Sequence, residues 1–131
     1  MPRLNHAKLP VADVTSLRDF FVAHFGFTSI HEPAGSPMAV LRGEDGFILN
    51  VMRRRPDDGP FPADFHVGFM FDSDAEVHAM HARLAAHGVR AGNVERMIRR
   101  GVTSTTFYCF GPNDIMVEVS CYVSDAPTTA T

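Results

Sequence analysis

The sequence predicts an α+β fold made of two similar modules, each of which runs strand, helix, strand, strand, strand. Three observations carry this prediction. Apolar residues alternate with polar ones in short stretches, as in strands, and recur three and four residues apart in two longer stretches, as in amphipathic helices. These stretches follow the same order in residues 4–52 and 65–121. Between them lies segment 54–63, which is rich in Pro, Gly and Asp and is typical of a linker.

The first module is expected to begin with a strand over Leu4–Leu9 that Pro10 ends. Asp13 or Ser16 can then cap a helix, because a short polar side chain there accepts a hydrogen bond from the first turn. Gly26 is expected to end that helix. The apolar stripe of the helix consists of Val14, Leu17, Phe20, Phe21 and Phe25.

Three strands are expected to complete the first module, over Phe27–Glu32, Met38–Arg42 and Phe47–Met52. The dipeptide Asp45–Gly46 lies between the last two. Asp-Gly is a strong hairpin signal, because both positions of the tight turn tolerate a positive φ. We therefore expect these two strands to pair.

The second module repeats this order. A strand is predicted over Phe65–Phe71. Ser73 and Glu76 form the spacing of a capping box, which marks the start of a helix that runs to about His87 and ends at Gly88. The apolar stripe of this helix consists of Val77, Met80 and Leu84.

The last three strands are predicted near Val94–Ile98, Thr103–Phe110 and Ile115–Cys121, with a tight turn at 112–114 between the last two. His78 and His81, three apart on the second helix, are expected on its solvated face.

The size and composition of the chain suit one compact domain. It has 131 residues, of which 45% are hydrophobic and 21% charged, close to globular averages. We expect a single domain over residues 1–123, with modules at about 3–53 and 64–122, the linker at 54–63 and a frayed tail at 124–131.

Charge and hydropathy exclude two classes of partner. The net charge is −3, and there is no basic stripe of the kind that nucleic-acid binders carry. No apolar run approaches the ~20 residues of a membrane helix, and no signal peptide is evident. Cys109 and Cys121 lie in apolar strands, which fits a reducing compartment. We therefore expect a cytoplasmic protein that binds neither nucleic acid nor membrane.

Two short arginine runs remain, 53–55 and 99–100. We expect both to be solvated loops. The alternative is a clamp for an anionic substrate.

The repeat places four polar residues at matching points of the two modules. His6 and His66 lie on the two first strands, and Asn50 and Glu118 lie on the two last strands, each four residues after its turn. Matched positions of two related sheets point to one convergent site.

Glu118 is the most informative of the four, because it interrupts the apolar stretch 115–121. A carboxylate in such surroundings costs several kcal/mol unless a cation or hydrogen-bond donors offset it. Two imidazoles and one carboxylate form a set that holds a divalent metal and leaves positions open for substrate. The alternative is that His6 and His66 are ordinary hydrogen-bonded core residues.

Four stretches carry a resemblance that covers the chain from Leu4 to about Tyr122. They are Leu4–Asp13 around His6, Phe20–Phe27 at the end of the first helix, Phe65–Phe69 around His66, and Phe107–Glu118, which joins an aromatic strand, a Pro-containing turn and a glutamate. In these stretches the chain resembles the vicinal oxygen chelate superfamily, which contains glyoxalase I, bleomycin-resistance proteins, fosfomycin-resistance enzymes and extradiol dioxygenases.

The resemblance implies two modules that curl into a cup-like mixed sheet around a divalent metal ion, with His6, His66 and Glu118 as ligands. The metal would be Fe, Mn, Zn, Ni or Co, because the ligands do not discriminate among them. The resemblance also implies a homodimer, in which a site can draw His6 from one chain and His66 with Glu118 from the other.

Within this superfamily several activities stay open. Glyoxalase I has a carboxylate ligand where this chain has Asn50, and epimerases have Gln there. We rank a lyase or isomerase acting on a small oxygen-rich substrate first, a thiol transferase second and an extradiol-type dioxygenase third. The alternative of another class is a non-catalytic protein that binds an antibiotic or metabolite, as bleomycin-resistance proteins do.

Two further side chains are expected in the chemistry beside Glu118. Strand alternation places Lys8 on the face of His6, where its ammonium can contact an anionic substrate group, and Tyr108 can offer a hydroxyl. The alternatives are that the Lys8 ammonium extends to solvent at the rim of the cup and that Tyr108 is a core aromatic residue whose hydroxyl reaches solvent. The expected substrate pocket is lined by Ile48, Asn50, Met52, Met70 and Met116.

Overall fold

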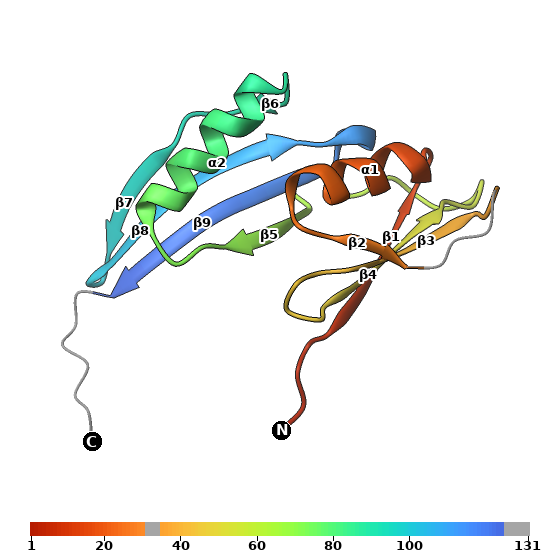
Figure 1. The fold of residues 1–131 in the computed structure, drawn as a ribbon, viewed down its shortest axis with the longest axis horizontal. Helices are drawn as coiled ribbons and strands as arrows, with labels where there is room; N and C mark the ends of the chain where they lie inside the picture. The colour runs from red at the N-terminus through yellow and green to blue at the C-terminus, as the bar shows by residue number, and fades with distance from the viewer. Residues whose placement is uncertain (31–34, 125–131) are drawn as a thin grey trace. The chain divides into compact units, whose positions relative to one another are not determined.

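The computed structural model describes residues 1–30 and 35–124. The chain divides into two compact units, Met1–Phe61 and Pro62–Thr131. Each unit carries a mixed β-sheet with a helix against one face (Figure 1). The predicted α+β fold of two strand–helix–three-strand modules is therefore confirmed. The end of the strand predicted at 27–32 and the predicted frayed tail lie outside the described residues, apart from Ser124.

The first unit forms a four-stranded sheet in the order β1-β4-β3-β2. β1 runs parallel to β4, and the other neighbours are antiparallel. Its elements are β1 (His6–Val11), α1 (Val14–His24), β2 (Thr28–Ile30), β3 (Met38–Arg42) and β4 (Ile48–Arg53).

β1 shows where the sequence prediction was wrong. The strand continues through Pro10 to Val11 instead of ending at Leu9. Proline has no N–H to donate, but β1 lies at the edge of its sheet, where only one side of the strand needs partners. Leu9 and Val11 are both 2% exposed, so the extra residues bury a further apolar side chain.

The caps of α1 follow the predicted pattern. Asp13 is the N-cap, and its carboxylate accepts from the backbone N–H of Ser16 at 3.1 Å. Gly26, just beyond the helix, has a φ of +69°, which an L side chain rarely adopts. Val14, Leu17, Phe20 and Phe21 are buried, as their spacing predicts, and they hold α1 on the sheet.

The second unit repeats the arrangement, with the strand order β5-β9-β8-β6 and with β7 also paired to β8. β5 is parallel to β9, and the other pairs are antiparallel. Its elements are β5 (His66–Met70), α2 (Asp74–Ala86), β6 (Arg90–Ala91), β7 (Glu95–Arg99), β8 (Val102–Phe110), the short 3-10 helix η1 (Pro112–Asp114) and β9 (Met116–Ser124).

The outer edge of the second sheet differs from the prediction of one strand. β6 pairs with residues 109–110 of β8, and β7 pairs with residues 102–106. Together they occupy the place that β2 has in the first unit. A strand of two residues has too few positions to show a period, which is why the sequence does not predict β6.

The capping box of α2 is present as predicted. The hydroxyl of Ser73 accepts from the backbone N–H of Glu76 at 3.2 Å and lies 3.1 Å from the Glu76 carboxylate. Val77 and Leu84 are fully buried against the sheet. The side chains of β8 and β9 that point toward α2 are buried as well: Phe107, Cys109, Val117, Val119 and Cys121.

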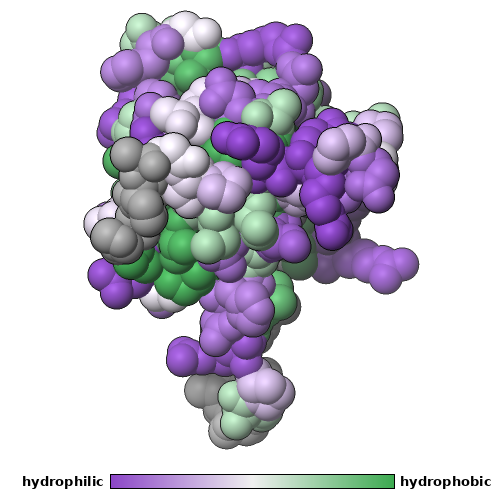
Figure 2. Space-filling view, turned by 90° about the vertical axis from the view of Figure 1, so that its right-hand side faces the viewer, coloured by the Kyte–Doolittle hydropathy of each residue, from purple (hydrophilic) through white to green (hydrophobic). Residues whose placement is uncertain are grey.

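Among the described residues, no helix is long and apolar enough to cross a bilayer. Hydrophilic residues cover much of the face drawn in Figure 2, with smaller apolar areas among them.

Candidate functional site

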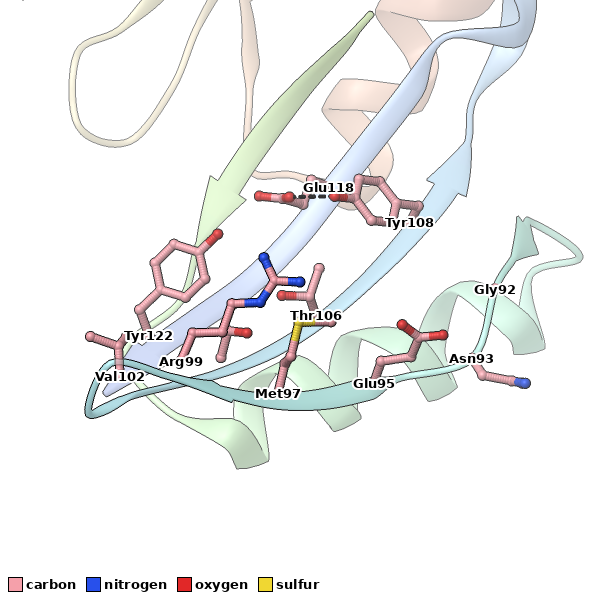
Figure 3. A pocket seen from close by; sticks show the side chains of 11 residues that line it. Gly92, Asn93, Glu95, Met97, Arg99, Val102, Thr106, Tyr108, Glu118 and Tyr122 are labelled. Carbon is pink, nitrogen blue, oxygen red and sulfur yellow. Dashed lines mark hydrogen bonds between the residues drawn. The ribbon is translucent and has the colours of Figure 1, made fainter. Parts of the chain in front are cut away.

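The face of the second sheet that points away from α2 carries a row of three paired residues. Glu118 on β9 lies between Gly68 on β5 and Tyr108 on β8. The hydroxyl of Tyr108 donates to Oε1 of Glu118 at 2.8 Å, as the dashed line in Figure 3 shows. Hydrogen bonds to a carboxylate are among the stronger ones in proteins. This bond fixes the direction of the Glu118 carboxylate, which is half-buried.

Gly68 leaves space beside that carboxylate. A Cβ built at this position would lie 3.6 Å from Oε2 and 3.6 Å from Cβ of Glu118. Any larger side chain would extend over the second carboxylate oxygen. The glycine therefore keeps Oε2 open on this side, while Tyr108 occupies Oε1.

His66 lies on the same face, one step along from this row. It pairs with Met116, two residues before Glu118 on the parallel neighbour. Its ring packs edge-on against Tyr108, with centroids 5.7 Å apart. Nδ1 lies 2.9 Å from the carbonyl oxygen of Asp64. Because a carbonyl can only accept, Nδ1 carries a proton, which leaves Nε2 as the nitrogen available to a ligand.

His6 of the first unit has the same local arrangement. Its Nδ1 lies 2.7 Å from the side-chain oxygen of Asn5, an acceptor that matches the tautomer with Nδ1–H and a bare Nε2. His6 pairs with Ile48, and the next row on this face consists of Lys8 and Asn50. Lys8 is exposed and Asn50 is half-buried.

The five predicted pocket residues lie on the faces that point away from the helices, as the strand phase requires. Ile48, Asn50 and Met52 are half-buried on β4. Met116 is half-buried on β9, and Met70 on β5 is 58% exposed.

A pocket of about 600 Å³ opens over β7, β8 and β9 of the second unit (Figure 3). That volume is in the range of small-molecule sites. Glu118 and Tyr108 lie at its wall, but the five predicted residues do not. Its lining is Gly92, Asn93, Glu95, Met97, Arg99, Val102, Ser104, Thr106, Tyr108, Glu118 and Tyr122.

Sequence reasoning missed most of this lining, although a usable signal was present. Ser104, Thr106 and Tyr108 alternate along β8, so a strand phase set by Tyr108 places all three on one face. The residues of β7 could not be added in the same way, because their register against β8 is a property of the fold.

His81 supports the pocket from the other side of the sheet. Its Nε2–H donates to the carbonyl of Gly92 at 2.8 Å, and its ring packs edge-on against Phe107 at 4.9 Å. Gly92 in turn donates to the carbonyl of Tyr108 at 2.8 Å. The expectation that His81 is merely a solvated helix residue was therefore wrong, because the segment after β6 folds back onto α2.

Two kinds of group in the second unit have raised pKa values. The hydrogen bond to Glu118, followed by burial and nearby negative charge, raises the pKa of Tyr108 to about 12. Burial raises the pKa of the Cys109 thiol to about 11 and raises that of Cys121 as well. Tyr108 is thus a proton donor at neutral pH, and the two free cysteines stay as thiols.

Within residues 1–30 and 35–124, no group of three or more His, Cys, Asp or Glu side chains is gathered closely enough to hold a metal ion. The predicted ligands are divided between the units, with His6 in the first and His66 and Glu118 in the second. The donor types nevertheless suit a divalent metal. Both imidazoles are held through Nδ1–H by an oxygen acceptor, which is the usual support of a histidine that binds metal through Nε2.

Comparison with known proteins places this arrangement in a family. A family model described as the glyoxalase/bleomycin resistance protein/dioxygenase superfamily matches residues 3–119. No curated protein matches the chain.

Solved structures agree with the family model. A possible glyoxalase from Bacillus cereus is 32% identical, with a TM-score of 0.75, over 91% of this chain and 98% of that one. The fosfomycin resistance protein FosX from Listeria monocytogenes is 20% identical, with a TM-score of 0.72, over 92% and 93%. A glyoxalase/bleomycin resistance protein/dioxygenase from Alicyclobacillus acidocaldarius is 17% identical, with a TM-score of 0.72, over 94% and 93%. Since the model spans nearly the whole of both units, the chain belongs to the glyoxalase/bleomycin resistance protein/dioxygenase superfamily, that is, the vicinal oxygen chelate superfamily.

Proposed function

We propose that this protein is a metal-dependent enzyme that acts on a small oxygen-rich organic substrate, with His6, His66 and Glu118 as the metal ligands. The observation that carries the proposal is the shared state of the two imidazoles. Each lies at the same point of its sheet, donates through Nδ1 and presents a bare Nε2. Both imidazoles are exposed, so they are not core residues, and this tautomer is the one in which a histidine binds metal through Nε2.

Glu118 fits the same role. Its Oε1 is held by Tyr108, and its Oε2 faces the space that Gly68 leaves open. A carboxylate with one anchored and one open oxygen is directed to bind a cation at the open oxygen. When bound, the metal would supply Lewis acidity toward two adjacent substrate oxygens.

The chain's own side chains would then handle substrate charge and protons. Lys8, on the row next to His6, would contact an anionic substrate group with its ammonium. Tyr108 remains protonated at neutral pH, so its hydroxyl can orient Glu118 or donate to a substrate oxygen that gains charge.

Among reaction classes, a lyase or isomerase is the first choice and a thiol transferase the second, with a ring-cleaving dioxygenase third. The position equivalent to Glu118 in the first unit holds Asn50, an amide that cannot take up a proton as a carboxylate base does. A reaction that needs a single carboxylate suits this chain better than one that needs two.

Metal analysis tests the proposal. Protein purified without chelator and reconstituted with Mn, Fe, Co, Ni or Zn should hold one divalent ion per chain. His66→Ala and Glu118→Gln should each lower metal affinity by at least roughly tenfold. His78→Ala, which removes an exposed imidazole from α2, is the matched control and should bind metal like the parent.

A chain that takes up no ion on reconstitution, or a His66→Ala variant that retains the parent's affinity, would overturn the proposal. It would favour a metal-free binding protein instead. Sedimentation of the same samples checks the proposed homodimer, which a purely monomeric species at micromolar concentration would contradict.

A further inference from the structure

One cationic side chain lines the pocket, and it extends from the end away from Glu118 toward the Glu118 side (Figure 3). Arg99 is the last residue of β7, and its guanidinium is directed into the pocket in Figure 3. No carboxylate in the described part of the chain lies within ion-pair distance of it. From the sequence, we expect Arg99 and Arg100 to lie together in a solvated loop. The structure instead places Arg99 on β7 and Arg100 in the turn that follows.

The separation comes from the hairpin between β7 and β8. Arg100 and Gly101 both have positive φ, +52° and +74°, which is the geometry of a two-residue hairpin turn. Arg99 pairs with Val102 directly beneath that turn. Arg100 therefore lies in the turn, whereas Arg99 shares the pocket face with Met97 and Glu95.

Polar hydrogen-bonding groups line the space between Arg99 and Glu118. Val102 and Tyr108, which lie at the two ends, are six residues apart on β8, about 20 Å of strand. Between them the pocket wall carries the hydroxyls of Ser104 and Tyr122, for which the described residues provide no hydrogen-bond partner. The arginine side chain spans part of this length, so a ligand of moderate size can contact both ends.

We propose that this pocket binds a substrate with a carboxylate group, which Arg99 receives together with the hydroxyls of Ser104 and Tyr122, while the reacting oxygens lie at Glu118. The guanidinium provides two parallel N–H donors for a carboxylate. The placement of the reacting oxygens at Glu118 rests on the proposed function. The placement of the substrate carboxylate rests on Arg99 alone.

Charge favours a carboxylate over a doubly charged phosphoryl or phosphonate group. The lining has one cation, Arg99, and two anions, Glu95 and Glu118. The guanidinium can pair with one ligand carboxylate, and every further negative charge on a ligand adds repulsion from the two lining carboxylates. A dianion would meet the Glu95 carboxylate without a second cation to offset it.

A matched pair of probes tests the inference on the full-length chain. 3-Phenylpropanoate and 3-phenylpropanamide have nearly the same shape and differ in charge. Titrated into ¹⁵N-labelled, EDTA-treated protein, the carboxylate should bind roughly fivefold more tightly than the amide, a preference typical of one exposed ion pair. The chemical shift changes should centre on Arg99 Nε and the amides of Val102 and Ser104.

Variants then assign the preference to one side chain. Arg99→Gln should make the two probes bind equally, and Arg99→Lys should keep part of the preference. Arg96→Gln is the matched control, because Arg96 lies on the same strand with its side chain on the opposite face. Arg96→Gln should preserve the full preference.

Equal binding of the two probes to the parent, or an unchanged preference in Arg99→Gln, would overturn the inference. The same titration on metal-reconstituted protein separates it from the proposed function. A carboxylate preference in a chain that takes up no metal supports Arg99 and refutes the metal site. Metal uptake by a chain that binds the two probes equally supports the metal site and refutes the role of Arg99.

Discussion

The two units build the same sheet and put different chemistry on it. In the first unit, one row across the open face consists of Lys8, Asn50 and Val40. In the second unit, the equivalent row consists of Gly68, Glu118 and Tyr108. The first row therefore carries a cation and an amide, and the second carries an anion held by a hydroxyl.

The neighbouring row is similar in the two units. His6 pairs with Ile48, and His66 pairs with Met116, so each imidazole lies beside an apolar side chain at the same step of the sheet. The comparison shows that the fold and the imidazoles are common to both units, whereas the charges are not. The asymmetry of this one row gives the second unit the acidic candidate residue, Glu118.

The largest expected effect tests whether the hydrophobic cores of the two units contribute equally to the free energy of unfolding. Leu17 on α1 and Leu84 on α2 are both fully buried. Leu17→Ala and Leu84→Ala should each lower the free energy of unfolding by about 2–5 kcal/mol, because each leaves a cavity beneath its helix. Urea unfolding measures the loss. A loss below about 1 kcal/mol for either variant would show that its helix is not held by this face.

The second prediction concerns a variant in which the row around Glu118 becomes more like the equivalent row of the first unit. Gly68→Lys gives the second unit the residue that Lys8 provides in the first. The new ammonium can reach the open oxygen of Glu118 and compete with a metal ion, so metal affinity should fall roughly tenfold. Calorimetric titration with Mn²⁺ measures it.

Gly68→Ala is the control for this change. Its Cβ would lie at ordinary contact distance from Glu118, so metal affinity should stay close to that of the parent. If Gly68→Lys bound metal as well as Gly68→Ala does, Glu118 would not be a ligand.

The smallest expected effect concerns the two cores at alkaline pH. Cys109 occupies the position on β8 that Leu41 has on β3, and burial raises the pKa of its thiol to about 11. The unfolded chain loses this proton at lower pH than the folded protein does. The thiol's contribution to stability is therefore present below the unfolded pKa and is lost as pH rises toward about 11.

Thermal unfolding between pH 8 and pH 11 measures this loss as a fall in Tm. Cys109→Ala should show a shallower fall with pH than the parent, whatever its Tm at neutral pH. Equal slopes would show that the buried thiol does not contribute to the pH dependence.

Local patterns in the sequence predicted the fold well. The capping interactions of Asp13 and Ser73, the positive φ of Gly26 and the two apolar helix stripes all depend on residues within a few positions of one another. The matched placement of His6 and His66 also followed from counting along each module, and the strand register confirms it.

The errors arose where a residue's surroundings come from distant segments. Pro10 is tolerated because β1 is an edge strand, and that depends on the sheet order. His81 has a partner because Gly92 returns to α2.

The sequence by itself determined the modules and their helices, because periodicity, capping and turn chemistry act over short stretches of chain. It offered His6, His66 and Glu118 as candidate ligands only through their matched positions and the family resemblance. Only the tertiary structure decided that Tyr108 holds Glu118, that Gly68 leaves its second oxygen open, and that Arg99 faces the pocket while Arg100 lies in the turn. These contacts join strands far apart in the chain, and their register is set by the packing of the whole sheet.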